Sequence, residues 1–236
     1  MNELPVVRGR LIAGGVLWAS SAQFFLAQAL AQRSWKGSAP YSLRTSWISD
    51  LGATTCGSYS GGGGVLVCSP RHALLNGGLT LLGAQVVLGT LLLLPVIGAA
   101  RYGRAAGALL VLAGAALPFV GAFPEDTGKP WHAVAATVHF AAAGLGMVAS
   151  GLAVRARHPR SAALTFGLGG ASLAGTVLTL AGSGAGVGRA AVERLAAWPF
   201  TLWTTAAGAL VLAAIATSRQ DNTHQPPEPA PPFVAI

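Results

Sequence analysis

Six long hydrophobic blocks, separated by short polar segments, dominate the chain. Each block is about twenty residues long, the length that an α-helix needs to cross about 30 Å of hydrocarbon at about 1.5 Å per residue. A membrane offers backbone amides no partner outside their own segment, so each block is expected to be helical. The pattern predicts an all-α bundle of six transmembrane helices, at residues 11–31, 72–98, 105–123, 131–154, 161–182 and 198–217.

The overall composition favours membrane spans over the core of a soluble domain. Hydrophobic residues make up 53% of the 236 positions and charged residues only 9%, whereas about a quarter of a soluble domain is charged. The net charge of +8 arises because the chain has only seven acids. Basic residues near a bilayer bind lipid head groups, so the expected partner is a membrane lipid or isoprenoid and not a nucleic acid. Small-residue faces permit a homo-oligomer without requiring one.

The charges of the loops orient the predicted bundle. Six spans place both termini on one side, together with the short loops 101–104 and 155–160. These loops are rich in arginine and contain no acid, which assigns them and both termini to the cytoplasm. We therefore predict a multi-pass protein of the cell membrane whose functional face is extracytoplasmic. Residues 218–236 are Pro-rich and are predicted to form a disordered cytoplasmic tail.

Both cysteines fall in the long first outer loop, residues 33–71. An oxidising compartment would let Cys56 and Cys68 form a disulfide. The bridge would close a short Gly-rich loop and remove about 3 kcal/mol of unfolded-state entropy. The alternative is two unrelated thiols, and the spacing does not match a C-x-x-C redox motif.

Ionisable side chains gather at the extracytoplasmic end of the predicted bundle. Four acids, two histidines and one arginine map to this level: Asp50, Glu125, Asp126, Glu193, His72, His132 and Arg194. His139 lies seven residues further into the fourth span, about 10 Å deeper. Ionisable groups inside a membrane are costly and are usually functional. This end of the bundle is therefore the expected functional site.

Helical phase predicts a polar cavity beneath these residues. Residues seven apart share one face of a helix, so His132 and His139 lie on one stripe of the fourth span. Other spans carry polar stripes too: Ser21, Gln28 and Gln32; His72, Asn76 and Thr80; Ser172, Thr176 and Thr179; Thr201 and Thr204. Such stripes can simply hold helices together, at about 0.6 kcal/mol per hydrogen bond. If they converge, the bundle contains a cavity that opens outward.

The predicted roles follow from the chemistry of each side chain. Carboxylates can act as general acid or base, and imidazoles can relay protons or bind a metal. The expected catalytic residues are Asp50, Asp126, His132, His139 and Glu193, and the expected substrate-binding residues are Ser49, His72, Asn76 and Arg194. Arg194 would hold an anionic head group. A metal, if one is bound, would use His72, His132 and His139, and a divalent ion such as zinc would suit them.

Some of these residues also have purely structural interpretations. Glu125 is interpreted as a solvated loop carboxylate. His72 could anchor its helix at the membrane interface, and Glu193 with Arg194 could form a surface pair, which would contribute little to stability.

Several short segments of the loops and helix ends resemble a known family. They are Tyr41-Ser42, Ile48-Ser49-Asp50-Leu51-Gly52, Cys56, Cys68-Ser69-Pro70 with Asn76, Phe123-Pro124-Glu125-Asp126, His132, His139 and Glu193-Arg194. The ordered set resembles the bacterial membrane family called domain of unknown function 998, over nearly the whole chain. Many relatives have Asn before the Ile-Ser-Asp segment, where this chain has Ser46 and Trp47. The resemblance implies six spans but no activity.

A looser likeness, in fold style only, is to membrane hydrolases of the alkaline ceramidase type. Those enzymes combine Ser, Asp and three His around zinc, and the present chain has a similar set of residues. The HxxxH spacing typical of them is absent. An analogy of this kind is weak support for a function.

Several functions are compatible with these residues. The working hypothesis is an enzyme that acts on a lipid or isoprenoid by carboxylate and histidine acid–base chemistry: hydrolysis, head-group transfer, or isoprenoid protonation and cyclisation. The second hypothesis is a non-catalytic lipid-binding or accessory protein that uses the same cavity. A transporter is disfavoured because no span has the broken-helix pattern with matched halves. Haem ligation by His72 with His132 or His139 is a further alternative.

Overall fold

The computed structural model describes residues 3–58 and 65–224. Its α-helices are α1 (Glu3–Ala19), α2 (Gln23–Gln32), α3 (His72–Ile97), α4 (Gly103–Ala122), α5 (Lys129–Val154), α6 (Pro159–Leu180) and α7 (Arg189–His224), with short 3₁₀ turns η1 (Ser20–Ala22) and η2 (Ser49–Gly52). Six helical segments are long and apolar enough to cross a membrane: Val7–Gln32, His72–Ile97, Gly103–Ala122, Lys129–Val154, Pro159–Leu180 and Arg189–Thr217. The predicted all-α fold with six spans is confirmed.

The first and last spans differ from simple single helices. The first consists of α1, η1 and α2 in succession. Helix α7 continues past the last predicted span to His224, so residues 218–224 of the predicted tail are helical. The rest of that tail lies outside the described residues.

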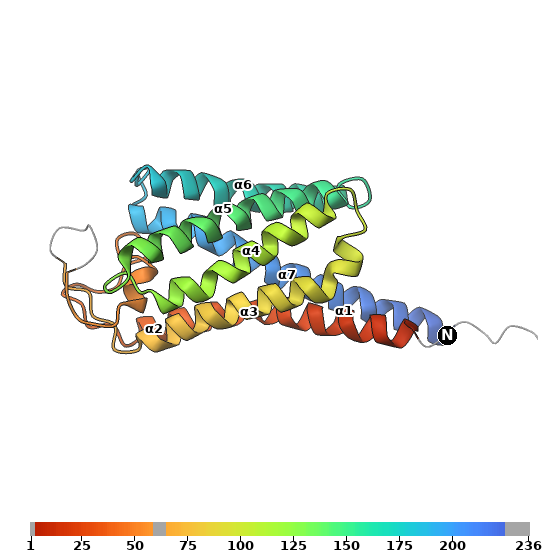
Figure 1. The fold of residues 1–236 in the computed structure, drawn as a ribbon, viewed down its shortest axis with the longest axis horizontal. Helices are drawn as coiled ribbons and strands as arrows, with labels where there is room; N and C mark the ends of the chain where they lie inside the picture. The colour runs from red at the N-terminus through yellow and green to blue at the C-terminus, as the bar shows by residue number, and fades with distance from the viewer. Residues whose placement is uncertain (1–2, 59–64, 225–236) are drawn as a thin grey trace, which may run out of the picture.

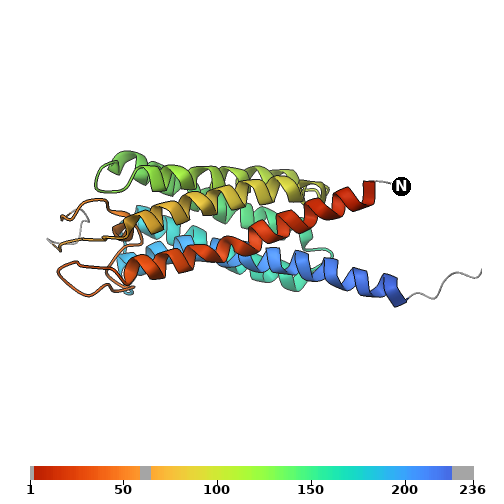
Figure 2. The same ribbon diagram turned by 90° about the horizontal axis from the view of Figure 1, so that it is seen from below.

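The six spans form a closed ring. Each packs against the next, in the order α1, α3, α4, α5, α6, α7 and back to α1. Figures 1 and 2 show an elongated bundle in which α1 begins and α7 ends on the same side, while residues 33–58 and 65–71 lie over the opposite end. We call this opposite end the loop end.

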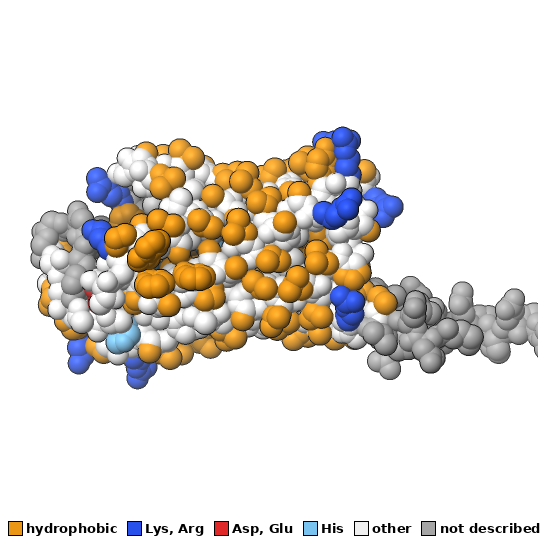
Figure 3. Space-filling view, in the orientation of Figure 1, with side chains coloured by type: hydrophobic (Ala, Val, Ile, Leu, Met, Phe, Trp, Pro, Cys, Tyr) orange, Lys and Arg blue, Asp and Glu red, His pale blue; other side chains and the backbone are white. Residues whose placement is uncertain are grey.

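The surface of the bundle matches the environment of a membrane. Hydrophobic side chains cover the middle of the face shown in Figure 3, and Lys and Arg side chains lie at its two ends. Large apolar residues such as Leu164 and Leu210 are 72% and 64% exposed, which a bilayer tolerates and water does not. Inside the ring, Leu75, Leu110 and Phe200 are fully buried. These features identify a multi-pass membrane protein.

Close contact between helices α1 and α7 depends on glycine. A Cβ added to Gly208 would lie 2.6 Å from the Gly15 carbonyl oxygen, and it would also press on the backbone of Ala19. Backbone atoms cannot move aside as a flexible side chain can. Small residues at such contacts let helices approach closely where lipid provides no hydrophobic drive.

We expect Gly208→Ala to lower stability by about 1–3 kcal/mol, because it overpacks the contact between α1 and α7. In a chain of this size each kcal/mol lowers Tm by about 2–4 °C, which thermal denaturation in detergent can measure. The matched control is Gly170→Ala, because a Cβ there meets nothing within 4 Å. A Gly208→Ala protein as stable as this control would contradict the prediction.

Candidate functional site

The loop end is organised by one disulfide within segment 33–71. Cys56 and Cys68 are joined by a disulfide, with their Cα atoms 4.4 Å apart, as the sequence predicted. Next to it the backbones of Gly57 and Val67 exchange hydrogen bonds of 3.0 and 2.8 Å. The disulfide therefore fixes the chain that leads into α3.

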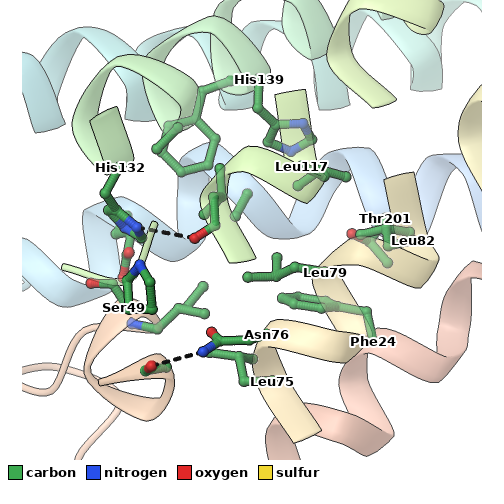
Figure 4. A pocket seen from close by; sticks show the side chains of 18 residues that line it. Phe24, Ser49, Leu75, Asn76, Leu79, Leu82, Leu117, His132, His139 and Thr201 are labelled. Atoms are coloured by element: carbon green, nitrogen blue, oxygen red, sulfur yellow. Dashed lines mark hydrogen bonds between the residues drawn. The ribbon is translucent and has the colours of Figure 1, made fainter. Parts of the chain in front are cut away.

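Two further hydrogen bonds attach turn η2 to the start of α3. The Ser69 hydroxyl donates to the Leu51 carbonyl at 2.8 Å. The Asn76 amide donates to the Gly52 carbonyl at 2.9 Å, as Figure 4 shows. Because both bonds go to the backbone of η2, they fix the position of the side chains that this turn carries, including Asp50.

The carboxyl groups of Asp50 and Glu125, from different loops, meet beside this turn. Asp50 is 3% exposed, and its Oδ2 accepts a hydrogen bond from the Trp47 N–H at 2.7 Å. The Asp50 carboxyl also hydrogen-bonds the Glu125 side chain, which requires a proton on one of the two groups. Burial, and next the Glu125 charge, raise the pKa of Asp50 to about 8, because both disfavour its ionised form. The pair therefore keeps its shared proton to a higher pH than a solvated carboxyl would.

A third carboxylate, Glu193 of α7, lies close to this pair. Its Oε2 accepts a hydrogen bond from the Ile48 N–H at 2.6 Å, and its charge acts on Asp50. Asp50 Oδ1 and Glu125 Oε1 are buried and receive no hydrogen bond from an N–H or hydroxyl donor. The charge of Arg194, the next residue on α7, also acts on Glu193. We call Asp50, Glu125 and Glu193 the acid cluster.

The acid cluster borders two adjoining spaces. The inner cavity has a volume of about 50 Å³, and Glu193, His132 and His139 line it among mainly apolar side chains (Figure 4). The second space is a groove of about 430 Å³ between α5 and α6, which Glu125 and Glu193 line. Ser49, His132 and Glu193 line both spaces. A group bound in the groove can therefore reach the side chains that face the inner cavity.

The histidines present the same ring nitrogen to a backbone carbonyl. Nδ1 of His132 lies 2.9 Å from the Phe123 oxygen and 3.3 Å from that of Val120, and Nδ1 of His139 lies 2.9 Å from the Ala113 oxygen. Carbonyl oxygens only accept hydrogen bonds, so Nδ1 carries a proton in each ring. In the neutral form of the ring, Nε2 has a lone pair and can act as a base. Both residues line the inner cavity, as their shared stripe predicted.

Comparison with known proteins assigns the family. The sequence model of the family described as "Protein of unknown function (DUF998)" matches residues 11–210. The chain belongs to the DUF998 family. Searches of curated proteins and of solved structures gave no match. The likeness to alkaline ceramidase-type hydrolases therefore has no support from them.

In this DUF998 protein Asp126, a predicted catalytic residue, caps a loop instead of joining the acid cluster. Its Oδ2 accepts hydrogen bonds of 2.8–3.1 Å from the backbone and hydroxyl groups of Thr54 and Thr55. Partial burial acts to raise the pKa of Asp126, but these hydrogen bonds outweigh it and leave the pKa below its ordinary value. Asp126 is thus held ionised, which suits a structural role.

Arg194 also points away from the two spaces. Its guanidinium donates to the carbonyl oxygens of Leu43, Ser46 and Ala190 and to the Tyr41 hydroxyl. It lines a separate groove beside Trp198. With these donors occupied, Arg194 fastens the segment 41–46 to α7, and the structure does not place it where a head group could meet the acid cluster.

The predicted metal ligands are not all brought together. His132 and His139 line the inner cavity, but His72 does not; its Nδ1 lies 3.1 Å from the Ser69 carbonyl oxygen at the start of α3. No group of three or more His, Cys, Asp or Glu side chains within residues 3–58 and 65–224 is arranged to hold a metal ion.

Sequence reasoning assigned no site role to Glu125, although it belongs to the acid cluster. Glu125 and Asp126 are neighbours in a turn, where no helical periodicity indicates which side chain faces inward. Lys129, which lines the groove, was also not assigned, and Thr179 was predicted only as part of the polar stripe of the fifth span. The run Phe123-Pro124-Glu125-Asp126 was the available signal, but it marks both acids equally.

Proposed function

We propose that this DUF998 protein is a membrane enzyme that acts on a lipid or isoprenoid at the loop end, which we place on the extracytoplasmic side. The observation that carries the proposal is the acid cluster, which gathers three carboxyl groups next to the two spaces that His132 lines. Acids brought together away from water are costly for folding, and such perturbed groups concentrate at functional sites.

The acid cluster and His132 together could supply an acid and a base within one site. The proton on Asp50, shared with Glu125, supports a general acid, since Glu125 lines the groove and could pass it to a bound molecule. In its neutral form His132 has a lone pair on Nε2 and could accept a proton as general base. Ser49 lines both spaces and offers a hydroxyl that could hold the substrate. Hydrolysis, head-group transfer and protonation of an isoprenoid double bond all use this pair of functions.

Non-catalytic lipid binding is the second candidate, favoured by the apolar lining of the inner cavity. Phe24, Leu75, Leu79 and Leu117 contribute to it (Figure 4). A carrier or accessory protein needs such a lining but has no use for a shared proton beside a basic imidazole. The two candidates therefore differ in whether a bound lipid is changed.

The test is incubation of the purified protein with a lipid extract, followed by mass spectrometry of every lipid consumed or formed. We expect the wild-type protein to convert at least one lipid, and His132→Ala to lower the rate by about a hundredfold or more, the usual contribution of a general base. The matched control is His72→Ala, because His72 also bonds a backbone carbonyl but lines neither space.

One result would overturn the enzyme proposal, and another would overturn the role assigned to His132. One is a wild-type protein that binds lipid and releases it unchanged, which would establish the carrier. The other is a turnover that His132→Ala and His72→Ala affect equally, which would show that His132 does no chemistry.

A further inference from the structure

The groove beside the acid cluster opens sideways between α5 and α6. These helices touch closely away from the loop end: a Cβ added to Gly144 would lie 2.6 Å from Leu173 Cγ, and one added to Gly151 would lie 2.7 Å from the Phe166 ring. Toward the loop end the two helices diverge, as Figure 1 shows. The groove lies in this widened part, and both of its walls belong to membrane-spanning segments.

The position and lining of the groove suit a hydrocarbon chain. Ala133, Ala136 and Phe140 of α5 face Leu180 of α6 across it. Its volume of about 430 Å³ falls within the range of about 300–1,000 Å³ that is usual for small-molecule sites. A molecule that reaches this opening from the side must come from the bilayer, so the occupant is a lipid.

One polar atom in the groove lacks a partner of its own. The Thr179 hydroxyl is buried and unpaired, whereas Thr176, one turn earlier, donates to the Ser172 carbonyl at 2.7 Å. Unpaired buried polar atoms cost free energy and call for an explanation. A head group that hydrogen-bonds this hydroxyl would satisfy it, and the side chains of Glu125 and Glu193 belong to the same lining.

The charged residues that line the groove favour some lipid head groups over others. Glu125 and Glu193 line it, and Asp50 lies directly behind Glu125. Lys129 is the only lysine or arginine in the groove lining among the described residues. Arg194 is engaged elsewhere. A phosphate monoester would therefore face more negative than positive charge, whereas a hydroxyl or ammonium group would face acceptors.

We infer that the groove between α5 and α6 admits a lipid from the bilayer, with one hydrocarbon chain between the helices and a hydroxyl or amine head group at the acid cluster. This inference rests on the proposed function and names its substrate class: a lipid whose head group donates hydrogen bonds and carries no negative charge.

The experiment compares three probes that share a hexadecyl chain bearing a diazirine: the alcohol, the amine and the phosphate. The full-length protein is placed in phosphatidylcholine nanodiscs with each probe and irradiated, and mass spectrometry locates the labelled residues. We expect the alcohol and the amine to label residues 133–140 and 176–180, at least about tenfold more than the phosphate does, which corresponds to about 1.4 kcal/mol.

Blocking variants test each wall of the groove. Ala133→Trp on α5 should lower the labelling at least tenfold, and Val134→Trp is its control, because Val134 faces another groove and is 56% exposed. On α6, Leu180→Trp should lower the labelling of the groove residues. Val177→Trp should leave it unchanged, since Val177 is 65% exposed and does not line the groove. The two walls give independent tests if one variant fails to fold.

Three results would overturn the inference: equal labelling by the phosphate probe, labelling that neither blocking variant reduces, or no labelling of residues 133–140 and 176–180. Labelling reports binding alone and does not depend on turnover. Selective labelling in a protein that leaves every lipid unchanged would therefore support this site and its lipid class while refuting the enzyme proposal.

Discussion

Replacing Asp50 with asparagine is expected to remove most of the loss of stability that the wild-type protein undergoes as pH rises from about 4 to about 8. The pKa of Asp50 is about 8 in the folded protein against an ordinary value of 3.8. Between these values the unfolded chain has released the proton and the folded protein still holds it, so stability falls as pH rises. Above the folded pKa the loss is complete, on the order of 5 kcal/mol for one group.

Asparagine is the suitable replacement because it imitates the protonated carboxyl. Its oxygen can keep the hydrogen bond from the Trp47 N–H, and its amide can donate to Glu125 as the shared proton does. It cannot ionise, so the repulsion from Glu125 and Glu193 does not develop at high pH. Thermal denaturation in detergent at pH 5 and pH 8.5 measures the effect: wild type should melt lower at pH 8.5, and the difference between the two pH values should be clearly smaller for Asp50→Asn.

The control for this prediction is Asp126→Asn, which should keep the wild-type dependence on pH between pH 5 and pH 8.5, because the contribution of Asp126 changes only at lower pH. The pKa of Asp126 is lowered, because hydrogen bonds from Thr54 and Thr55 outweigh its partial burial. Its contribution to stability is therefore present above its ordinary pKa and is lost as pH falls through the folded value. A wild-type protein that is more stable at pH 8.5 than at pH 5 would mean that Asp50 does not hold the proton.

The helices of the bundle were predictable from sequence because a membrane imposes one physical rule on every segment. Lipid offers no partner to the backbone, so each apolar run of sufficient length becomes helical regardless of its neighbours. The spacing of His132 and His139 was equally informative, because a helix has a fixed period and places residues seven apart on one face. Both rules are local and need no knowledge of which helices are neighbours.

The acid cluster was only partly predictable because its members meet through loops. Asp50 and Glu125 are distant in sequence, and no period relates a residue of one loop to a residue of another. Neighbouring residues on α7 illustrate the same problem: Glu193 faces the cavity, whereas Arg194, about 100° further around the helix, turns toward Tyr41. Because Glu193 and Arg194 are adjacent in sequence, a surface pair between them was a reasonable prediction. In the structure Arg194 instead packs against segment 41–46, and only Glu193 faces the cavity.

The double substitution Cys56→Ser with Cys68→Ser is expected to lower stability by about 3 kcal/mol, because the disulfide closes a loop with a sequence separation of 12 residues and restricts the unfolded chain. That loss corresponds to a Tm about 6–12 °C lower. The effect should reach the acid cluster as well, since the Lys36 N–H donates to the Cys68 carbonyl at 2.9 Å and Ser69 holds η2. Thermal denaturation with and without reductant measures it.

Ser69→Ala separates the disulfide from the hydrogen bond that follows it in the sequence. This variant keeps both cysteines and loses only the 2.8 Å bond to the Leu51 carbonyl, for which about 1 kcal/mol is expected. Reductant should lower the Tm of wild type and of Ser69→Ala by similar amounts and should leave the double cysteine variant unchanged. If the double cysteine variant had the same Tm as the wild type, the hydrogen bonds from Ser69 and Asn76 alone would hold turn η2. The disulfide would then contribute nothing to the position of Asp50.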